Sequence, residues 1–261
     1  MDFMHIQLIR HATVILTLSG KKILIDPMLS PQGTMAPVPD SANQKPNPLV
    51  ELPVDPTALL DVDAVLLTHT HRDHFDDRAK ELIPKNLPVF CQPEDAAKLE
   101  QFGFYDVRPV NQSLTWDGIR FIRTSGHHGT DEIGEKMAPV SGYLLQSDAE
   151  PYLYIAGDTV WCQEVAKALE TYSPQTILLN GGAAEFLTGG PITMTAQDIA
   201  QVAFHVPKAK IIVVHMEAFN HCFLTRKDLR NYLRENGLNQ RVNCPENGEI
   251  ITIRNDYRAR P

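Results

Sequence analysis

The chain has 261 residues, of which 43% are hydrophobic and 21% are charged, and its formal net charge is -8. A chain of this length can bury a substantial core without disulfides or structural metals, and its acidity argues against a protein that coats nucleic acid, since phosphate binding needs a surplus of Lys and Arg. No run reaches the roughly 18 apolar residues that a membrane-spanning helix needs, so we expect neither nucleic acid nor a membrane as a partner.

Short apolar runs closed by turn residues dominate the first part of the chain. The runs 14–18 and 23–25 flank a Ser-Gly-Lys-Lys turn, which predicts a β-hairpin. The next predicted elements are, in chain order, a strand at 64–68, a helix at 76–82, a strand at 89–91, a helix at 93–102, a strand at 107–110 and a hairpin over 113–124 that turns at Asp117-Gly118.

Eight prolines mark a segment without periodicity between the first hairpin and the strand at 64–68. They are Pro27, Pro31, Pro37, Pro39, Pro46, Pro48, Pro53 and Pro56. Because proline lacks a backbone N–H group, this segment cannot be a regular helix or a central strand. It is either a structured surface loop or a lid, and loops of this length in compact domains are often functional.

Strands and helices alternate through the rest of the chain. In order, we predict strands at 142–147 and 151–156, a helix at 163–172, a strand at 176–180, a helix at 195–206, a strand at 211–214, a helix at 225–235 and a strand at 249–254. Thr195 and Thr225 are each followed three residues later by an aspartate, which is a typical signal for a helix N-terminus.

This order predicts an α/β layered sandwich in which helices lie outside two β-rich halves, about 1–148 and 149–261. No linker-like composition separates the halves, so we expect one domain over 1–261. The cysteines are scattered and form no C-x-x-C pair, and the first 20 residues lack a secretory pattern. A reducing cytoplasm is therefore the expected compartment.

The segment 66–75, Leu-Leu-Thr-His-Thr-His-Arg-Asp-His-Phe, holds three imidazoles and a carboxylate directly after a predicted buried strand. Imidazole nitrogens and carboxylate oxygens are the ligands that Zn²⁺ and similar divalent ions take. His69 and His71 are two residues apart, so their side chains share a face if the segment is extended, and a following turn would bring Asp73 and His74 to an adjacent point. The segment therefore predicts half the ligands of two neighbouring metal ions.

This segment resembles the H-x-H-x-D-H signature of the metallo-β-lactamase-fold superfamily. Four weaker features follow that family's order along the chain: Asp26 after the first hairpin, a glycine-flanked histidine pair at 125–129, Asp158 after a later strand and His215 after another. The resemblance implies a four-layered αβ/βα sandwich, the metallo-β-lactamase fold. Within the superfamily, the chain is similar to the branch of ascorbate-6-phosphate lactonases and related small cytoplasmic hydrolases.

The resemblance also implies ligands for two divalent ions. One ion would be held by His69, His71 and one histidine of the adjacent pair. We choose His127 for that place, because Gly126-His127 aligns with the family's Gly-His, and His128 stays open as the competitor, as a residue behind the ligands or as one that faces the substrate.

The second ion would be held by Asp73, His74 and His215, and Asp158 would bridge both ions. A histidine that ends an apolar strand is often structural, and this is the alternative interpretation of His215. His221, six residues later, is the alternative to His215 or a residue near the substrate.

Two further residues border this predicted site. Asp26 is expected behind the ligands, because ligand histidines usually donate their other N–H group to a carboxylate or a carbonyl; Asp-Pro turn chemistry explains it nearly as well. His11, just before the first strand, is interpreted as an ordinary polar residue, with a place at the border of the site as the alternative.

The implied chemistry is hydrolysis by a hydroxide held between two ions about 3.5–4 Å apart, whose bound water ionises near neutral pH. Asp73 and Asp158 are the predicted catalytic carboxylates. Both hold charge and geometry, and Asp73 could also orient the nucleophile or move its proton. No G-x-S-x-G elbow marks a separate serine nucleophile.

The predicted function is a metal-dependent hydrolase of a small-molecule ester, lactone or phosphorylated substrate. A phosphodiesterase or nuclease is the runner-up, disfavoured by the acidic charge and by the lack of room for a nucleic-acid domain, and a non-hydrolytic metal-binding protein is the third hypothesis. The ligand types predict zinc or manganese, and iron is compatible with them. Homo-oligomerisation stays open from the sequence.

Overall fold

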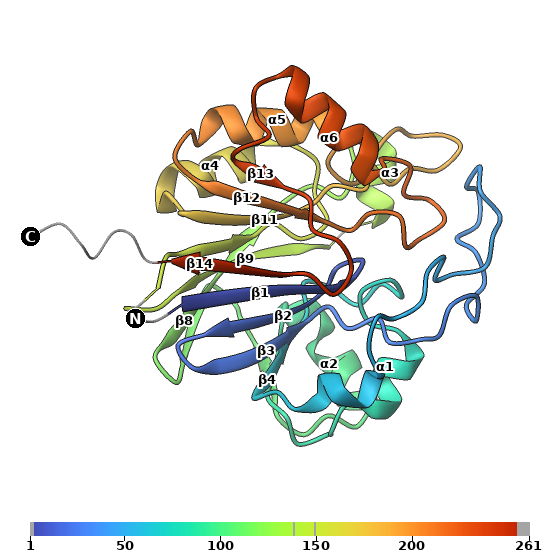
Figure 1. The fold of residues 1–261 in the computed structure, drawn as a ribbon. Coiled ribbons are helices and arrows are strands. Elements are labelled where there is room, and N and C mark those ends of the chain that lie inside the picture. The colour runs from blue at the N-terminus through green and yellow to red at the C-terminus, as the bar shows by residue number, and fades with distance from the viewer. Residues whose placement is uncertain (1–2, 138, 149, 255–261) are drawn as a thin grey trace, which may run out of the picture.

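In the computed structural model, which describes residues 3–137, 139–148 and 150–254, two seven-stranded sheets pack face to face between two layers of helices (Figure 1). The helices on one outer face are α1 (Asp77–Leu82) and α2 (Pro93–Gln101). Those on the other are α4 (Gln163–Tyr172), α5 (Ala196–His205) and α6 (Arg226–Glu235). This arrangement confirms the four-layered αβ/βα sandwich.

The first sheet combines strands from both ends of the chain in the order β14-β1-β2-β3-β4-β5-β6. Its strands are β1 (Phe3–Arg10), β2 (Thr13–Leu18), β3 (Lys21–Ile25), β4 (Ala64–Leu66), β5 (Val89–Cys91), β6 (Val107–Pro109) and β14 (Ile250–Arg254). Neighbours from β14 to β3 are antiparallel, whereas those from β3 to β6 are parallel. A short 3-10 helix, η1 (Pro56–Leu60), precedes β4.

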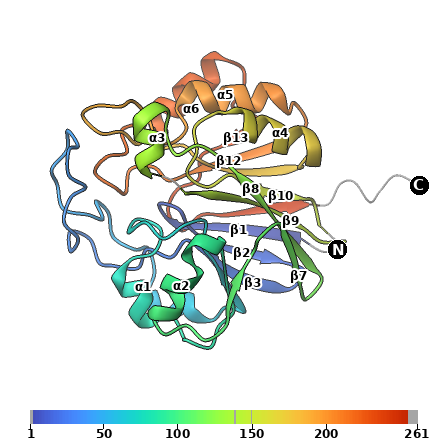
Figure 2. The same ribbon diagram turned by 180° about the vertical axis from the view of Figure 1, so that it is seen from behind.

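The second sheet has the order β13-β12-β11-β10-β9-β8-β7. Its strands are β7 (Ser113–Trp116), β8 (Ile119–Ser125), β9 (Ser141–Gln146), β10 (Leu153–Ile155), β11 (Thr176–Asn180), β12 (Lys210–Val214) and β13 (Val242–Asn243). Strands β10 to β13 are parallel, and β9 pairs with β10 antiparallel. Figure 2 shows the same layers from behind, with α4, α5 and α6 on the side away from the first sheet.

The chain passes from the first sheet to the second between β6 and β7. The sequence prediction had placed the division between the two halves later, near residue 148. Strands β7, β8 and β9 belong to the second sheet, and β14 returns to the first, where it pairs with β1. The strand at Phe3–Arg10, absent from the sequence predictions, provides the edge that β14 covers. Which sheet a strand joins depends on such non-local pairing, which a run of apolar residues does not encode.

An apolar core joins the two sheets. Leu16 and Ile25 from the first sheet and Phe121 and Leu178 from the second are buried in it. The rings of Phe90 and Phe121 stack across the interface with centroids 4.4 Å apart. Full burial of one such side chain contributes roughly 1.5–3 kcal/mol, so this core gives the loops at the strand ends a rigid base.

The proline-rich segment forms a fixed excursion, which we call the strap (residues 27–50). The buried guanidinium group of Arg10 donates to main-chain carbonyls at both ends of the strap, at 2.9 and 3.0 Å. The strap is attached to the other half of the molecule at two points, because the N–H of Val38 in its middle and Nδ2 of Asn47 near its end both donate to Asn220 Oδ1, at 2.9 and 2.7 Å. Of the two sequence interpretations, the structured loop describes it best.

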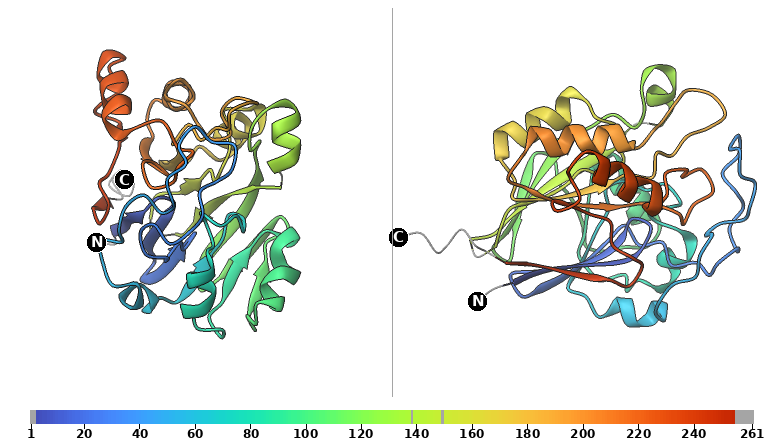
Figure 3. Two further views of the ribbon diagram at one scale, coloured as in Figure 1. Left: turned by 90° about the vertical axis from the view of Figure 1, so that its right-hand side faces the viewer. Right: turned by 45° about the horizontal axis from the view of Figure 1, so that its top comes forward.

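The carboxyl ends of the parallel strands in both sheets point to one end of the molecule, where the strap and the helix α3 (Asp131–Met137) also lie (Figure 3, left). Ligands of α/β proteins typically bind at such carboxyl ends. Within the described part of the chain, no helix combines the length and apolar character needed to cross a membrane.

Candidate metal centre

Strand β4 carries the histidine-rich segment to this end of the first sheet. Thr68 fixes the start of the segment, because its backbone N–H and its hydroxyl donate to the Asp26 carboxylate at 2.8 and 2.7 Å. A turn follows, in which the N–H of His74 donates to the carbonyl of His71 at 3.0 Å. The side chain of Asp76 then caps α1, so the side chains of the segment converge before the helix begins.

Three imidazoles form what we call the open corner of the cluster. They are His69, His71 and His128, and their ligand atoms lie within 4.8 Å of one another. His69 Nε2 is 2.9 Å from His71 Nδ1. His69 and His128 are buried but His71 is partly exposed, so solvent reaches this corner.

Four buried side chains form what we call the closed corner: His11, Asp73, His74 and His215. Asp73 Oδ2 is 3.2 Å from His11 Nε2 and 3.3 Å from His215 Nε2. The same oxygen is 3.6 Å from His74 Nε2. Three segments far apart in the chain, which follow β1, β4 and β12, thus bring nitrogen and oxygen ligands to one point.

Asp158, which follows β10, lies between the two corners. Its Oδ2 is 3.1 Å from His74 Nε2 in the closed corner and 3.5 Å from His128 Nε2 in the open corner. Its Oδ1 accepts a hydrogen bond from Asn180 Nδ2 at 2.7 Å. A carboxylate held in this position can contact ions in both corners.

In two of these imidazoles, the ring nitrogen that faces away from the cluster contacts a protein oxygen. His74 Nδ1 is 2.9 Å from Asp26 Oδ2, which is the position expected for Asp26. His128 Nδ1 lies 2.9 Å from the main-chain carbonyl of Ile192, to which it donates. Such contacts fix the tautomer and leave Nε2 free to bind a metal.

The charges of the cluster also suit a cation. Burial would raise the pKa of Asp73 and of Asp158, but the imidazoles of His74 and His215, with that of His11 also acting on Asp73, hold the pKa of both carboxyls well below the usual value. Burial would lower the pKa of His74 and His215, but the carboxylates raise it well above the usual value. Protons on the imidazoles therefore balance the buried negative charge in the protein alone, and a divalent ion would supply the same charge at the same place.

The structure places His127 and His128 in the opposite way to the prediction, which chose His127 as the ligand. His128 lies in the cluster, whereas the side chain of His127 is 54% exposed and its Nε2 pairs with Glu164 Oε1 at 3.2 Å. Neighbouring side chains on an extended segment point to opposite sides, and the hydrogen bond to Ile192 selects His128 as the one that points inward. The structure therefore corrects the choice of His127.

The structure also separates His215 from His221. His215 lies in the closed corner, and the sulfur of Cys222 is 3.6 Å from its Nδ1. His221 is not one of the clustered side chains, but it is buried nearby, with 5% of its surface exposed.

His11 is the main residue that sequence reasoning missed. It is fully buried in the closed corner, and burial lowers the pKa of its ring to about 3. Its backbone has a φ of 59°, and its carbonyl accepts the N–H of His215 at 2.8 Å, so it joins the two sheets at the cluster. No ligand spacing surrounds His11 in the sequence, and its place depends on the left-handed turn between β1 and β2. Asn180, which holds Asp158, was missed for the same reason, since its partner is distant in sequence.

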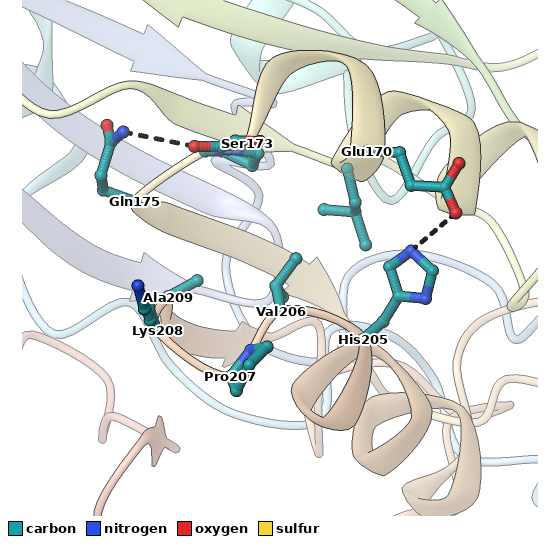
Figure 4. A pocket seen from close by; sticks show the side chains of 10 residues that line it. Glu170, Ser173, Gln175, His205, Val206, Pro207, Lys208 and Ala209 are labelled. Carbon is teal, nitrogen blue, oxygen red and sulfur yellow. Dashed lines mark hydrogen bonds and ion pairs between the residues drawn. The ribbon is translucent and has the colours of Figure 1, made fainter.

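A separate cavity of about 340 Å³ lies at the opposite ends of β11 and β12 (Figure 4). Its walls include Ser173, Gln175 and Lys208, and at its rim His205 Nε2 pairs with Glu170 Oε1 at 3.2 Å. None of the metal-ligating groups found among the described residues lies there. The metal chemistry therefore belongs to the carboxyl ends of the strands.

The chain is similar to known proteins along nearly its whole length. Residues 21–216 match the family model described as "Beta-lactamase superfamily domain". The UPF0173 protein YddR of Bacillus subtilis is 42% identical over 96% of this chain and 100% of the relative, and the UPF0173 metal-dependent hydrolase of Rubrobacter xylanophilus is 24% identical over 92% and 93%. The crystal structure of an isothiocyanate hydrolase from Delia radicum gut bacteria superimposes with a TM-score of 0.92 at 37% identity, covering 96% of this chain and 99% of the other.

Proposed function

Since the chain belongs to the metallo-β-lactamase superfamily and to its UPF0173 family of metal-dependent hydrolases, we propose that it uses two divalent ions to hydrolyse a small, uncharged electrophile, with an isothiocyanate as the leading candidate. The observation that carries the substrate proposal is the 37% identity to an isothiocyanate hydrolase over 96% of this chain. A lactone is the second candidate, because the sequence resembles the lactonase branch of the superfamily.

We assign one ion to each corner. The open-corner ion would be held by His69, His71 and His128 together with Asp158. The closed-corner ion would be held by Asp73, His74 and His215, also with Asp158, and His11 would hold Asp73 in place through the 3.2 Å contact. Imidazole and carboxylate donors without thiolates suit zinc or manganese, and iron is compatible with them.

When bound, the two ions would ionise a water molecule near neutral pH and polarise the substrate group that this water molecule attacks. Asp158 holds the distance between the corners, and Asn180 keeps its carboxylate oriented through the 2.7 Å hydrogen bond. Asp73 has one oxygen directed at the closed-corner imidazoles and is the residue best placed to orient the attacking water and accept its proton. For an isothiocyanate, addition of water to the central carbon and cleavage of the C–N bond yield an amine and carbonyl sulfide; for a lactone, cleavage of the ring ester yields a hydroxy acid.

Beside the cluster, Lys98 Nζ donates to Thr70 Oγ1 at 2.9 Å and not to a ligand side chain. Among the residues that the structure describes, no Lys or Arg forms an ion pair or a hydrogen bond with a side chain of either corner or with Asp158. Phosphate groups are usually recognised by such cations in addition to metal ions. A phosphorylated substrate, which the sequence left open, is therefore the less favoured alternative.

A hydrolysis screen of the metal-loaded protein tests the proposal. Isothiocyanates, lactones, thioesters and phosphodiesters are each supplied with Zn²⁺ or Mn²⁺, and the metal content is measured by elemental analysis. We expect turnover of an isothiocyanate or a lactone that stops when the metal is removed by a chelator and returns on its replacement. Turnover of phosphodiesters alone, or a content below one ion per chain after metal-replete purification, would contradict the proposal.

A further inference from the structure

Among the residues that the structure describes, the ring of His221 makes no hydrogen bond. Its Nδ1 is inaccessible to solvent and unpaired within the described residues, and only 5% of the residue is exposed. Buried polar side chains in native proteins nearly always have a partner, and an exception calls for an explanation such as a ligand or an ordered water. The ring therefore has an unused donor or acceptor close to the metal centre.

The ring lies within electrostatic reach of both corners. Burial lowers the pKa of His221 to about 4, with a raising effect of Asp73 and a lowering effect of His215. Asp158 also raises the pKa of His221, and His128 also lowers it. An imidazole in this environment is neutral at pH 7, so it can donate one hydrogen bond and accept another.

Apolar rings flank His221 on two sides. The centroid of the Phe219 ring is 5.7 Å from that of His221, and the centroid of the Phe186 ring is 6.1 Å away. Phe219 is buried and Phe186 is half-buried. Leu187, the residue after Phe186, is 67% exposed, so apolar residues continue along this loop to the surface.

Three loops hold this arrangement in place. The N–H of Glu185 donates to the carbonyl of His221 at 2.9 Å, and the N–H of Leu187 donates to the carbonyl of Asp40 in the strap at 2.7 Å. Asn220, next to His221, is bonded to the strap through its side chain. The backbone around His221 is therefore fixed, which pre-organises its ring for a ligand.

We infer that His221 is a catalytic residue that contacts the substrate, and that Phe186 and Phe219 form an apolar wall for the substrate's hydrocarbon substituent. The inference rests on the proposed function, since it names the substrate class of the same site: an aryl or alkyl isothiocyanate, or an apolar lactone. His221 donates a hydrogen bond to the heteroatom that gains negative charge when water attacks the adjacent carbon. That atom is the sulfur or nitrogen of the isothiocyanate or the carbonyl oxygen of the lactone.

The test compares steady-state kinetics of the metal-loaded protein with benzyl isothiocyanate. His221→Phe keeps a ring of similar size but removes the donor, and we expect kcat/KM to fall about 100-fold or more, as when one donor to a developing negative charge is removed. His221→Asn retains an amide donor and should recover part of the loss. The metal content and the thermal midpoint of both variants should match the wild type, and His205→Phe, at the opposite end of the sheet, serves as the matched control.

Activity of His221→Phe within threefold of the wild type would overturn the catalytic role. A loss that is accompanied by an equal loss of metal would overturn it as well, because it would show a structural effect on the centre. His221→Asn as inactive as His221→Phe, with full metal content, would argue that the donor has no part in the reaction.

Phe186→Ala tests the apolar wall separately and does not touch the ring nitrogen. We expect the ratio of kcat/KM for benzyl over methyl isothiocyanate to fall about tenfold, since apolar contacts discriminate substituents by such factors, whereas the value for the methyl compound changes little. An unchanged ratio would overturn the wall.

The two proposals fail in different ways. If the wild type hydrolyses phosphoesters and no isothiocyanate or lactone, the proposed function fails, and the same His221 variants are then assayed with the phosphoester. A drop of at least tenfold in His221→Phe would retain the catalytic role of His221 with another substrate, whereas no drop would overturn both proposals.

Discussion

The open and closed corners of the metal centre differ in their side chains, in burial and in support, since three imidazoles form the open corner and Asp73 adds a carboxylate to the closed one. Every side chain of the closed corner is buried, whereas the open corner includes the partly exposed His71. In the closed corner, His74 is backed by the Asp26 carboxylate at 2.9 Å, and in the open corner His128 is backed by a neutral main-chain carbonyl.

This difference predicts different roles for the two ions that we propose. A carboxylate behind a ligand makes the imidazole a stronger donor to a metal than a carbonyl does, and burial limits exchange with solvent. We therefore expect the closed-corner ion to be bound more tightly, and the open-corner ion to exchange more readily and to face the incoming substrate.

Asp158→Ala should have the largest effect, because it removes the carboxylate shared by both corners. We expect turnover to fall by at least about 1,000-fold, since metal-derived transition-state stabilisation amounts to several kcal/mol and each 1.4 kcal/mol is a tenfold change in rate. Circular dichroism should show an intact fold, and Asp77→Ala on the surface of α1 is the matched control. Unchanged turnover in Asp158→Ala would refute the shared role and leave the corners independent.

Paired variants test the order of metal affinity. After dialysis against a mild chelator, we expect His71→Ala to retain about one ion per chain and His215→Ala to retain clearly less, because only the first leaves the closed corner complete. Elemental analysis with the wild type alongside provides the measurement. Equal retention, or the reverse order, would show that burial does not decide which ion is held.

Asp26→Asn should have the smallest effect and the most local one. The amide keeps the size of the side chain but loses the charge behind His74, so closed-corner affinity should fall by roughly 10- to 100-fold. Competition with a chromophoric chelator measures this change, and Asp63→Asn on the surface is the control. If both variants bind metal equally well, the Asp26 contact does not distinguish the corners.

Part of the site could be predicted because it is local in sequence. Thr68 to His74 form one continuous segment, so their spacing alone indicates a metal-binding loop at a strand end. Asp158 and His215 were predicted from the resemblance to the metallo-β-lactamase-fold superfamily, whose pattern has an aspartate and a last histidine after later strands. The closed corner still lacked His11 in the prediction, because no spacing in the sequence connects residue 11 with the rest.

The adjacent residues His127 and His128 show where local sequence pattern is no longer sufficient. His127 and His128 have the same chemistry, and residues adjacent on an extended segment face opposite ways. The carbonyl of Ile192, 64 residues further along the chain, receives His128 and so decides which ring turns inward. A partner that distant is set by tertiary packing.

Most of the elements, the layered fold and the central histidine-rich segment could be read from the sequence, because hydrophobic periodicity and ligand spacing act over short stretches of chain. The strand Phe3–Arg10, the sheet that β7 to β9 and β14 join, the presence of His128 and His11 in the cluster, and the burial of His221 beside it, with Nδ1 unpaired among the described residues, emerged only in the tertiary structure. These outcomes depend on backbone turns and hydrogen bonds between segments far apart in the chain, whose energies exist only once the two sheets have packed.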